Sequence, residues 1–138
     1  MRRIRTCVAL IAVLVCSVTV AHAQTMVLQQ NKCDMGKVGT IRAFVDSAFV
    51  PIAQELVNEG KIMGFHSAFH AWGDEWNVVY IYVAEDIPAF LNAFGEAFSR
   101  MTERYPEAMP MMRDWCFEHK DSFLSMGKMT EHAPMPGR

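Results

Sequence analysis

Residues 62–83 constrain the fold most, because they read as two strands that reverse direction at Gly73-Asp74-Glu75. Successive side chains of a strand point to opposite faces, so each strand presents two sets of residues. One face is predicted to be plain core. The other face gathers rings with hydrogen-bonding tips, namely His66, His70, Trp72, Trp76, Tyr80 and Tyr82. Such a face needs a cover in water, which can be a partner subunit, a ligand or both.

A three-residue turn predicts the register of this hairpin. It pairs Trp72 with Trp76 and His66 with Tyr82. In that register one apolar set lies under the helices, namely Phe65, Phe69, Val79, Ile81 and Val83. A slip by one residue would scatter this set over both faces, so we expect the three-residue turn.

Apolar residues at three- and four-residue steps predict an amphipathic helix over residues 38–56, before the hairpin. Pro51 is expected to kink or divide it. Gly60 is expected to end it as a left-handed cap. A first strand over residues 25–32 precedes this helix.

A second helix follows the hairpin, with Asp86 as its N-cap and its last turn at Tyr105. A short third helix over residues 111–120 and a strand over residues 121–126 complete the chain order. This order predicts an α+β fold of the ferredoxin-like βαββαβ type, with one antiparallel sheet and helices on one face.

The first 23 residues have the pattern of a signal peptide. Three arginines precede an apolar run over residues 8–20, and Ala21-His22-Ala23 provides a small-x-small cleavage site. A run of about 13 residues is too short to span a bilayer, which needs roughly 20. We therefore expect cleavage near Ala23, a periplasmic or secreted protein, and no membrane span in the mature form.

The mature chain is expected to be one domain over residues 24–126 with a disordered tail over 127–138. Removal of the signal takes three of 13 basic residues, so ten remain against 15 acidic ones and the net charge is −5. No basic cluster remains. Nucleic acid and anionic membrane surfaces are therefore poor candidates for partners.

Two of the four cysteines leave with the signal, so Cys33 and Cys116 remain in an oxidising compartment. We expect them to form a disulfide. Closing a loop of about 84 residues would stabilise the fold by about 4 to 5 kcal/mol on the chain-entropy model. A redox or metal-ligand pair is the alternative, but neither cysteine has CxxC spacing.

His66 and His70 are four residues apart, about 13 Å along a strand, which is too far for both to bind one metal ion. We therefore predict no metal site. Each histidine can act alone as a general base, a hydrogen-bond donor or an axial ligand to a haem. The alternative is that both fill a polar subunit interface.

Three segments together carry a family resemblance, namely "FVPIAQELVNEGKIMGF", "HAWGDEWNVVYIYVAED" and "IPAFLNAFGEAFSRM". The chain resembles the dimeric α/β-barrel superfamily, which includes antibiotic-biosynthesis-type monooxygenases and haem-degrading proteins. The resemblance implies that two ferredoxin-like subunits press their open sheet faces together. It also implies that the enclosed space holds a substrate or haem.

These observations predict an exported homodimer that binds a small hydrophobic or aromatic molecule through Trp72, Trp76, Tyr80 and Tyr82. If the protein is an enzyme, we expect a monooxygenase-like oxidoreductase, cofactor-free or haem-linked, with His66, His70 and Tyr80 as catalytic residues. The competing hypothesis is a non-catalytic envelope protein whose aromatic face serves dimerisation alone.

Overall fold

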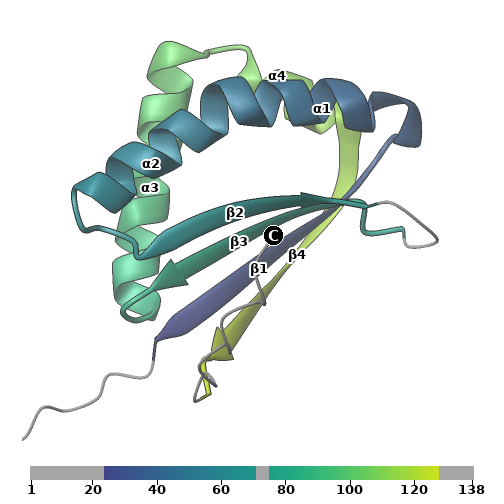
Figure 1. The fold of residues 1–138 in the computed structure, drawn as a ribbon. Coiled ribbons are helices and arrows are strands. Elements are labelled where there is room, and N and C mark those ends of the chain that lie inside the picture. The colour runs from purple at the N-terminus through teal and green to yellow at the C-terminus, as the bar shows by residue number, and fades with distance from the viewer. Residues whose placement is uncertain (1–23, 71–74, 128–138) are drawn as a thin grey trace, which may run out of the picture.

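The computed structural model describes residues 24–70 and 75–127 (Figure 1). The predicted signal peptide, Trp72, the turn residues Gly73 and Asp74, and the tail from Lys128 onward lie outside the described residues.

Within the described residues, four antiparallel strands form one sheet in the order β2-β3-β1-β4. The helices cover one face of this sheet, and we call the other face the open face (Figure 1). The strands are β1 (Thr25–Cys33), β2 (Gly64–Phe69), β3 (Val78–Ala84) and β4 (Cys116–Ser125). This arrangement confirms the predicted ferredoxin-like α+β fold.

The first helical segment is divided into shorter helices, as expected from Pro51. A short 3-10 turn leads into an α-helix, a π-helical stretch follows, and a second α-helix then begins with Pro51 in its first turn. Gly60 has a φ of 71°, so it supplies the predicted left-handed cap. The elements are η1 (Met35–Lys37), α1 (Val38–Phe44), η2 (Val45–Phe49) and α2 (Val50–Asn58).

The second predicted helix is α3 (Ile87–Arg104). The Asp86 side chain accepts a hydrogen bond of 2.7 Å from the backbone N–H of Ala89, which confirms its role as N-cap. Arg100 of α3 pairs with Glu55 of α2 at 2.8 Å and with Glu59, the C-cap of α2, at 2.7 Å. Hydrogen bonds from Arg100 and Lys61 lower the pKa of Glu59 to about 2. These contacts hold the two helices side by side over the sheet.

The end of the chain differs from the sequence prediction. The third helix is α4 (Ala108–Trp115), and β4 begins already at Cys116, so the predicted helix over 111–120 is wrong in its second half. β4 pairs with β1 along the whole of β1, from Thr25 to Cys33. Backbone pairing with a long neighbouring strand thus overrides the local helical pattern.

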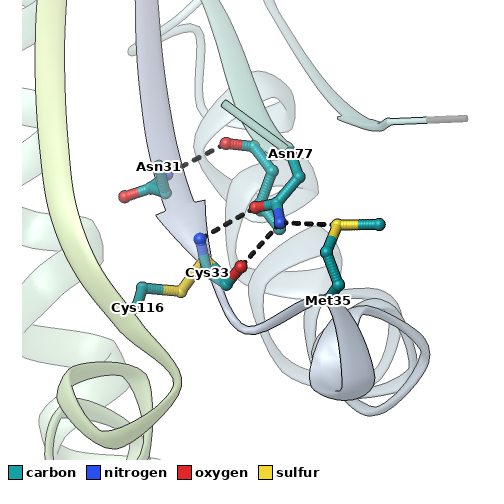
Figure 2. Close-up of a disulfide and its surroundings, with 6 residues drawn as sticks. Asn31, Cys33, Met35, Asn77 and Cys116 are labelled. Carbon is teal, nitrogen blue, oxygen red and sulfur yellow. Dashed lines mark hydrogen bonds between the residues drawn. A yellow bond between two sulfur atoms is a disulfide. The ribbon is translucent and has the colours of Figure 1, made fainter. Parts of the chain in front are cut away.

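The predicted disulfide between Cys33 and Cys116 is present and ties the end of β1 to the start of β4 (Figure 2). Asn77, only 2% exposed, extends the β1–β3 contact beyond its last residue pair. Its Oδ1 accepts from the Cys33 N–H at 2.8 Å, and its Nδ2 donates to the Cys33 carbonyl at 2.6 Å (Figure 2). Asn31 adds a bond to the Val78 carbonyl at 3.3 Å. The two hydrogen bonds from the Asn77 side chain thus continue the backbone pairing of β3 with β1 and hold the two strands in register.

We predict that Asn77→Ala lowers the free energy of unfolding by about 2 to 4 kcal/mol, because it leaves the buried N–H and C=O of Cys33 without partners. Urea unfolding with the disulfide intact measures this loss. Asn92→Ala on the exposed side of α3 is the matched control and should lose almost nothing. Equal effects of the two substitutions would contradict the role given to Asn77.

Candidate functional site

The β2–β3 hairpin has a different register from the one predicted. Phe65 pairs with Tyr82 and Ser67 with Tyr80, whereas the prediction paired His66 with Tyr82. The observed register is one residue away, so it places the tyrosines and His66 on opposite faces. Among the described residues, the backbone hydrogen bond nearest the turn joins the His70 N–H to the Asn77 carbonyl at 3.0 Å. The predicted pair of Trp72 with Trp76 lies outside the described residues.

Burial along β3 shows which of its two alternating sets of side chains packs against the helices. Its residues alternate strictly, with Val78, Tyr80, Tyr82 and Ala84 buried and the residues between them half-buried. The prediction that Val79, Ile81 and Val83 lie under the helices is therefore wrong, and so is the prediction that Tyr80 and Tyr82 lie on the open face. The placement of Phe65 and Phe69 under the helices is confirmed.

The two tyrosine rings are part of an aromatic cluster between sheet and helices. Tyr80 stacks on Phe49 of η2, with ring centroids 5.5 Å apart. Tyr82 lies 5.0 Å from Phe65 and 5.3 Å from Phe90 of α3. A tyrosine ring buries more apolar area than a valine side chain, so these ring contacts favour the observed register over the predicted one.

A cavity of about 720 Å³ lies between this sheet face and the helices, and we call it the helix–sheet cavity. Its walls are largely apolar and combine aromatic with aliphatic side chains, and they include Phe49, Leu56, Phe65, Phe90, Phe94, Ala97, Met101 and Met112. Its polar lining comes mainly from the sheet, namely Gln29, Asn31, Tyr80, Glu118, His119 and Asp121, with Arg113 from α4. The exposed side chains of Phe98 and Phe117 also line it, so the cavity reaches the surface.

Three polar residues on neighbouring strands form a row across the floor of the cavity, which we call the polar row. Gln29 of β1 pairs with Tyr80 of β3 on one side and with Asp121 of β4 on the other. The Tyr80 hydroxyl is buried and has no hydrogen-bond partner among the described residues. Gln29 beside it is half-buried and Asp121 at the end of the row is exposed, so the Tyr80 hydroxyl is the buried group of the row that lacks a partner. A buried polar group without a partner is rare and marks a place where a ligand can supply one.

Burial raises the pKa of the Tyr80 and Tyr82 hydroxyls well above the ordinary value. The charges of Tyr80 and Asp121 add to this shift at Tyr82. Both phenols are therefore neutral at physiological pH, and each can donate as well as accept a hydrogen bond.

The open face carries the other predicted site residues that the structure describes. His66 is exposed there on β2, and the ring of Trp76 lies 4.4 Å from the Lys120 ammonium of β4. The sheet thus separates His66 and Trp76 from Tyr80 and Tyr82, and the predicted single cluster is wrong. The catalytic roles of His66 and His70 stay predictions.

The middle of the open face is apolar, and Gln30, Lys120 and Ser122 add polar side chains to it. Its half-buried or exposed aliphatic residues come from three strands, namely Met26, Leu28, Val79, Ile81, Val83 and Leu124. Among residues 24–70 and 75–127, no group of three or more His, Cys, Asp or Glu side chains could hold a metal ion. None of the helices in these ranges is long and apolar enough to cross a membrane.

Comparisons with known proteins give the fold. No family model and no curated protein matches the chain. Among solved structures, a NIPSNAP family protein of unknown function from Agrobacterium tumefaciens superposes with a TM-score of 0.63 at 13% identity, over 79% of this chain and 93% of that one.

Two further solved structures are described as dimeric. A dimeric ferredoxin-like protein from an uncultured marine organism superposes with a TM-score of 0.62 at 5% identity, over 81% of this chain and 94% of that one. A dimeric protein of unknown function from Bacteroides fragilis gives 0.52 at 9% identity, over 75% and 97%. These likenesses support the ferredoxin-like fold of this chain.

Sequence reasoning missed Gln29, Asp121 and the phenylalanines of the helices as lining residues. The four-residue spacing of Phe90 and Phe94 was the available signal, since it puts two rings on one face of α3, where they need ring partners on the sheet.

We predict that Tyr80→Phe raises the free energy of unfolding by about 1 to 2 kcal/mol, because it removes a buried hydroxyl without a partner and keeps the ring. Chemical unfolding of the ligand-free protein measures the change. Phe49→Ala, which removes the ring stacked on Tyr80, should instead destabilise by about 3 to 5 kcal/mol. A loss of stability in Tyr80→Phe would show that the hydroxyl has a partner in the folded protein.

Proposed function

We propose that this protein is a homodimer in which each subunit binds a small aromatic or hydrophobic molecule in its helix–sheet cavity. The observation that carries the proposal is the aromatic cavity of about 720 Å³ with the unpartnered Tyr80 hydroxyl in its lining. Small-molecule sites have this size and are mostly apolar, with a few polar groups that orient the ligand.

The open face is the proposed dimer interface. A single sheet layer with helices on one side leaves its other apolar face in water unless a second layer covers it. Ile81 lies near the centre of this face, on an inner strand. Solved structures of the same fold are described as dimeric. In this arrangement His66 contacts the partner subunit, which agrees with its alternative interpretation as an interface residue.

The mature protein is proposed to act in the periplasm or outside the cell. The signal-peptide pattern of residues 1–23 supports this location. The disulfide between Cys33 and Cys116 supports it too, because disulfides persist in oxidising compartments.

A monooxygenase-like oxidation is the enzymatic form of the proposal. His66 lies across the sheet from Tyr80, so the two cannot act together on a ligand in the helix–sheet cavity. Neither His66 nor His70 lines this cavity, so neither fits as an axial ligand to a haem bound there. An oxidation in the cavity would therefore depend on the polar row, with Tyr80 orienting the ligand.

We predict that the purified protein is a dimer at micromolar concentration and that Ile81→Glu makes it monomeric, because the substitution places a charge in an apolar interface. Sedimentation velocity measures the oligomeric state. Val50→Glu, at an exposed apolar position on α2, is the matched control and should stay dimeric. A monomeric wild-type protein would refute the proposed interface.

We predict that naphthalene binds the protein and that Ala97→Phe weakens its binding at least tenfold, because the added ring fills part of the cavity. Isothermal titration calorimetry measures both affinities. Ala43→Phe on the exposed side of α1 is the control with the same change in size. Unchanged affinity in Ala97→Phe would place naphthalene elsewhere on the protein.

A further inference from the structure

The polar row gives the helix–sheet cavity a chemical preference. Resting on the proposed function, we infer that the cavity selects aromatic molecules that carry a hydroxyl or amino donor and rejects aromatic carboxylates. Tyr80, Gln29 and Asp121 are the specificity-determining residues of this selection.

Strand pairing places these three side chains next to one another. Gln29 is the direct neighbour of Tyr80 on β3 and of Asp121 on β4. Neighbouring strands lie about 4.8 Å apart, so the polar row spans roughly 10 Å of the cavity floor. A flat molecule of two or three fused rings can therefore contact the whole row with one polar edge.

The rings around the row favour an aromatic body for the ligand. Tyr80 has Phe49 stacked on it, and Tyr82 lies between Phe65 and the α3 rings Phe90 and Phe94. Aromatic pairs with offset or edge-to-face geometry gain more than their buried area alone provides. A planar aromatic molecule can join this cluster, whereas an aliphatic chain would gain only from burial.

The hydrogen-bonding capacity of the row decides which substituent fits. The neutral phenol of Tyr80 and the amide of Gln29 can each donate and accept, but an ionised Asp121 can only accept. A ligand O–H or N–H can donate to Asp121 while Tyr80 or Gln29 completes the network. A ligand carboxylate would instead face the charge of Asp121.

Other charges at the cavity do not reverse this preference. Arg113 is exposed on α4 and its Nε donates to the Met109 carbonyl at 3.4 Å. Glu118 and His119, both exposed on β4, lie between this arginine and Asp121 in the chain. Glu118 is paired with Lys32, whose Nζ lies 3.6 Å from its carboxylate. Asp121 is therefore the acid that shares the polar row with Tyr80 and Gln29.

Calorimetric titration of the mature protein, residues 24–138, with four probes tests the inference. Naphthalene is the unsubstituted reference, 1-naphthol and 1-aminonaphthalene carry the two kinds of donor, and 1-naphthoate carries the charge. We expect the two donors to bind about tenfold more tightly than naphthalene, and the carboxylate to bind more weakly than naphthalene. The comparison of the two donors distinguishes a hydroxyl from an amino ligand.

Asp121→Asn and Tyr80→Phe should each reduce the preference for the donors over naphthalene to about threefold or less, and Asp121→Asn should also relieve the rejection of 1-naphthoate. Asp114→Asn is the matched control. It makes the same change of charge at an exposed position on α4 outside the cavity lining and should keep the wild-type order.

Two outcomes would overturn the inference. If wild-type protein binds naphthalene and 1-naphthol equally, or 1-naphthoate most tightly, the polar row does not select donors, while the proposed cavity stands. If none of the four probes binds, the proposed function and the inference fall together.

Discussion

The Asn77 side chain, next to β3, forms hydrogen bonds with both the N–H and the C=O of Cys33 in β1. The disulfide links Cys33 to Cys116 of β4. Three strands therefore meet at one fixed position, and β3 cannot slide relative to β1 without breaking buried hydrogen bonds. Because side chains alternate along a strand, this fixed register decides that Tyr80 and Tyr82 face the helices. The aromatic residues and the polar row that line the cavity therefore depend on this register.

The sequence could predict the order of the elements and the helix ends at Gly60 and Asp86, because each has a local sequence signal. It could also predict the disulfide, because only two cysteines remain after the predicted signal peptide and the expected compartment is oxidising. The hairpin register could not. Both alternating sets of β3 suit a pleated surface, and Val79 and Ile81 look more like core than the tyrosines do. The contacts that select one set are made with residues distant in the chain, namely Cys33, which Asn77 binds, and the rings of Phe49 and Phe90 on the helices. The predicted last strand is too short for a similar reason, because residues 116–120 form a strand only through pairing with β1, which is distant in the chain.

We propose a different use for each face of the sheet. The helix-covered face holds the cavity, where we propose that the polar row of Tyr80, Gln29 and Asp121 selects the ligand. The open face has an aliphatic centre and carries His66 on β2, and we propose that a second subunit covers it. The residues expected to form one site therefore lie on two faces of the sheet, and a substitution on one face should leave the side chains of the other face in place.

Nuclear Overhauser effects from the ring of Tyr80 test the central claim most directly, because they report which face of the sheet the ring occupies. The observed register predicts cross-peaks between Tyr80 and Phe49, whose ring centroids are 5.5 Å apart, and between His66 and its strand neighbour Ile81. Cross-peaks between Tyr80 and His66, without any from Tyr80 to Phe49, would contradict it.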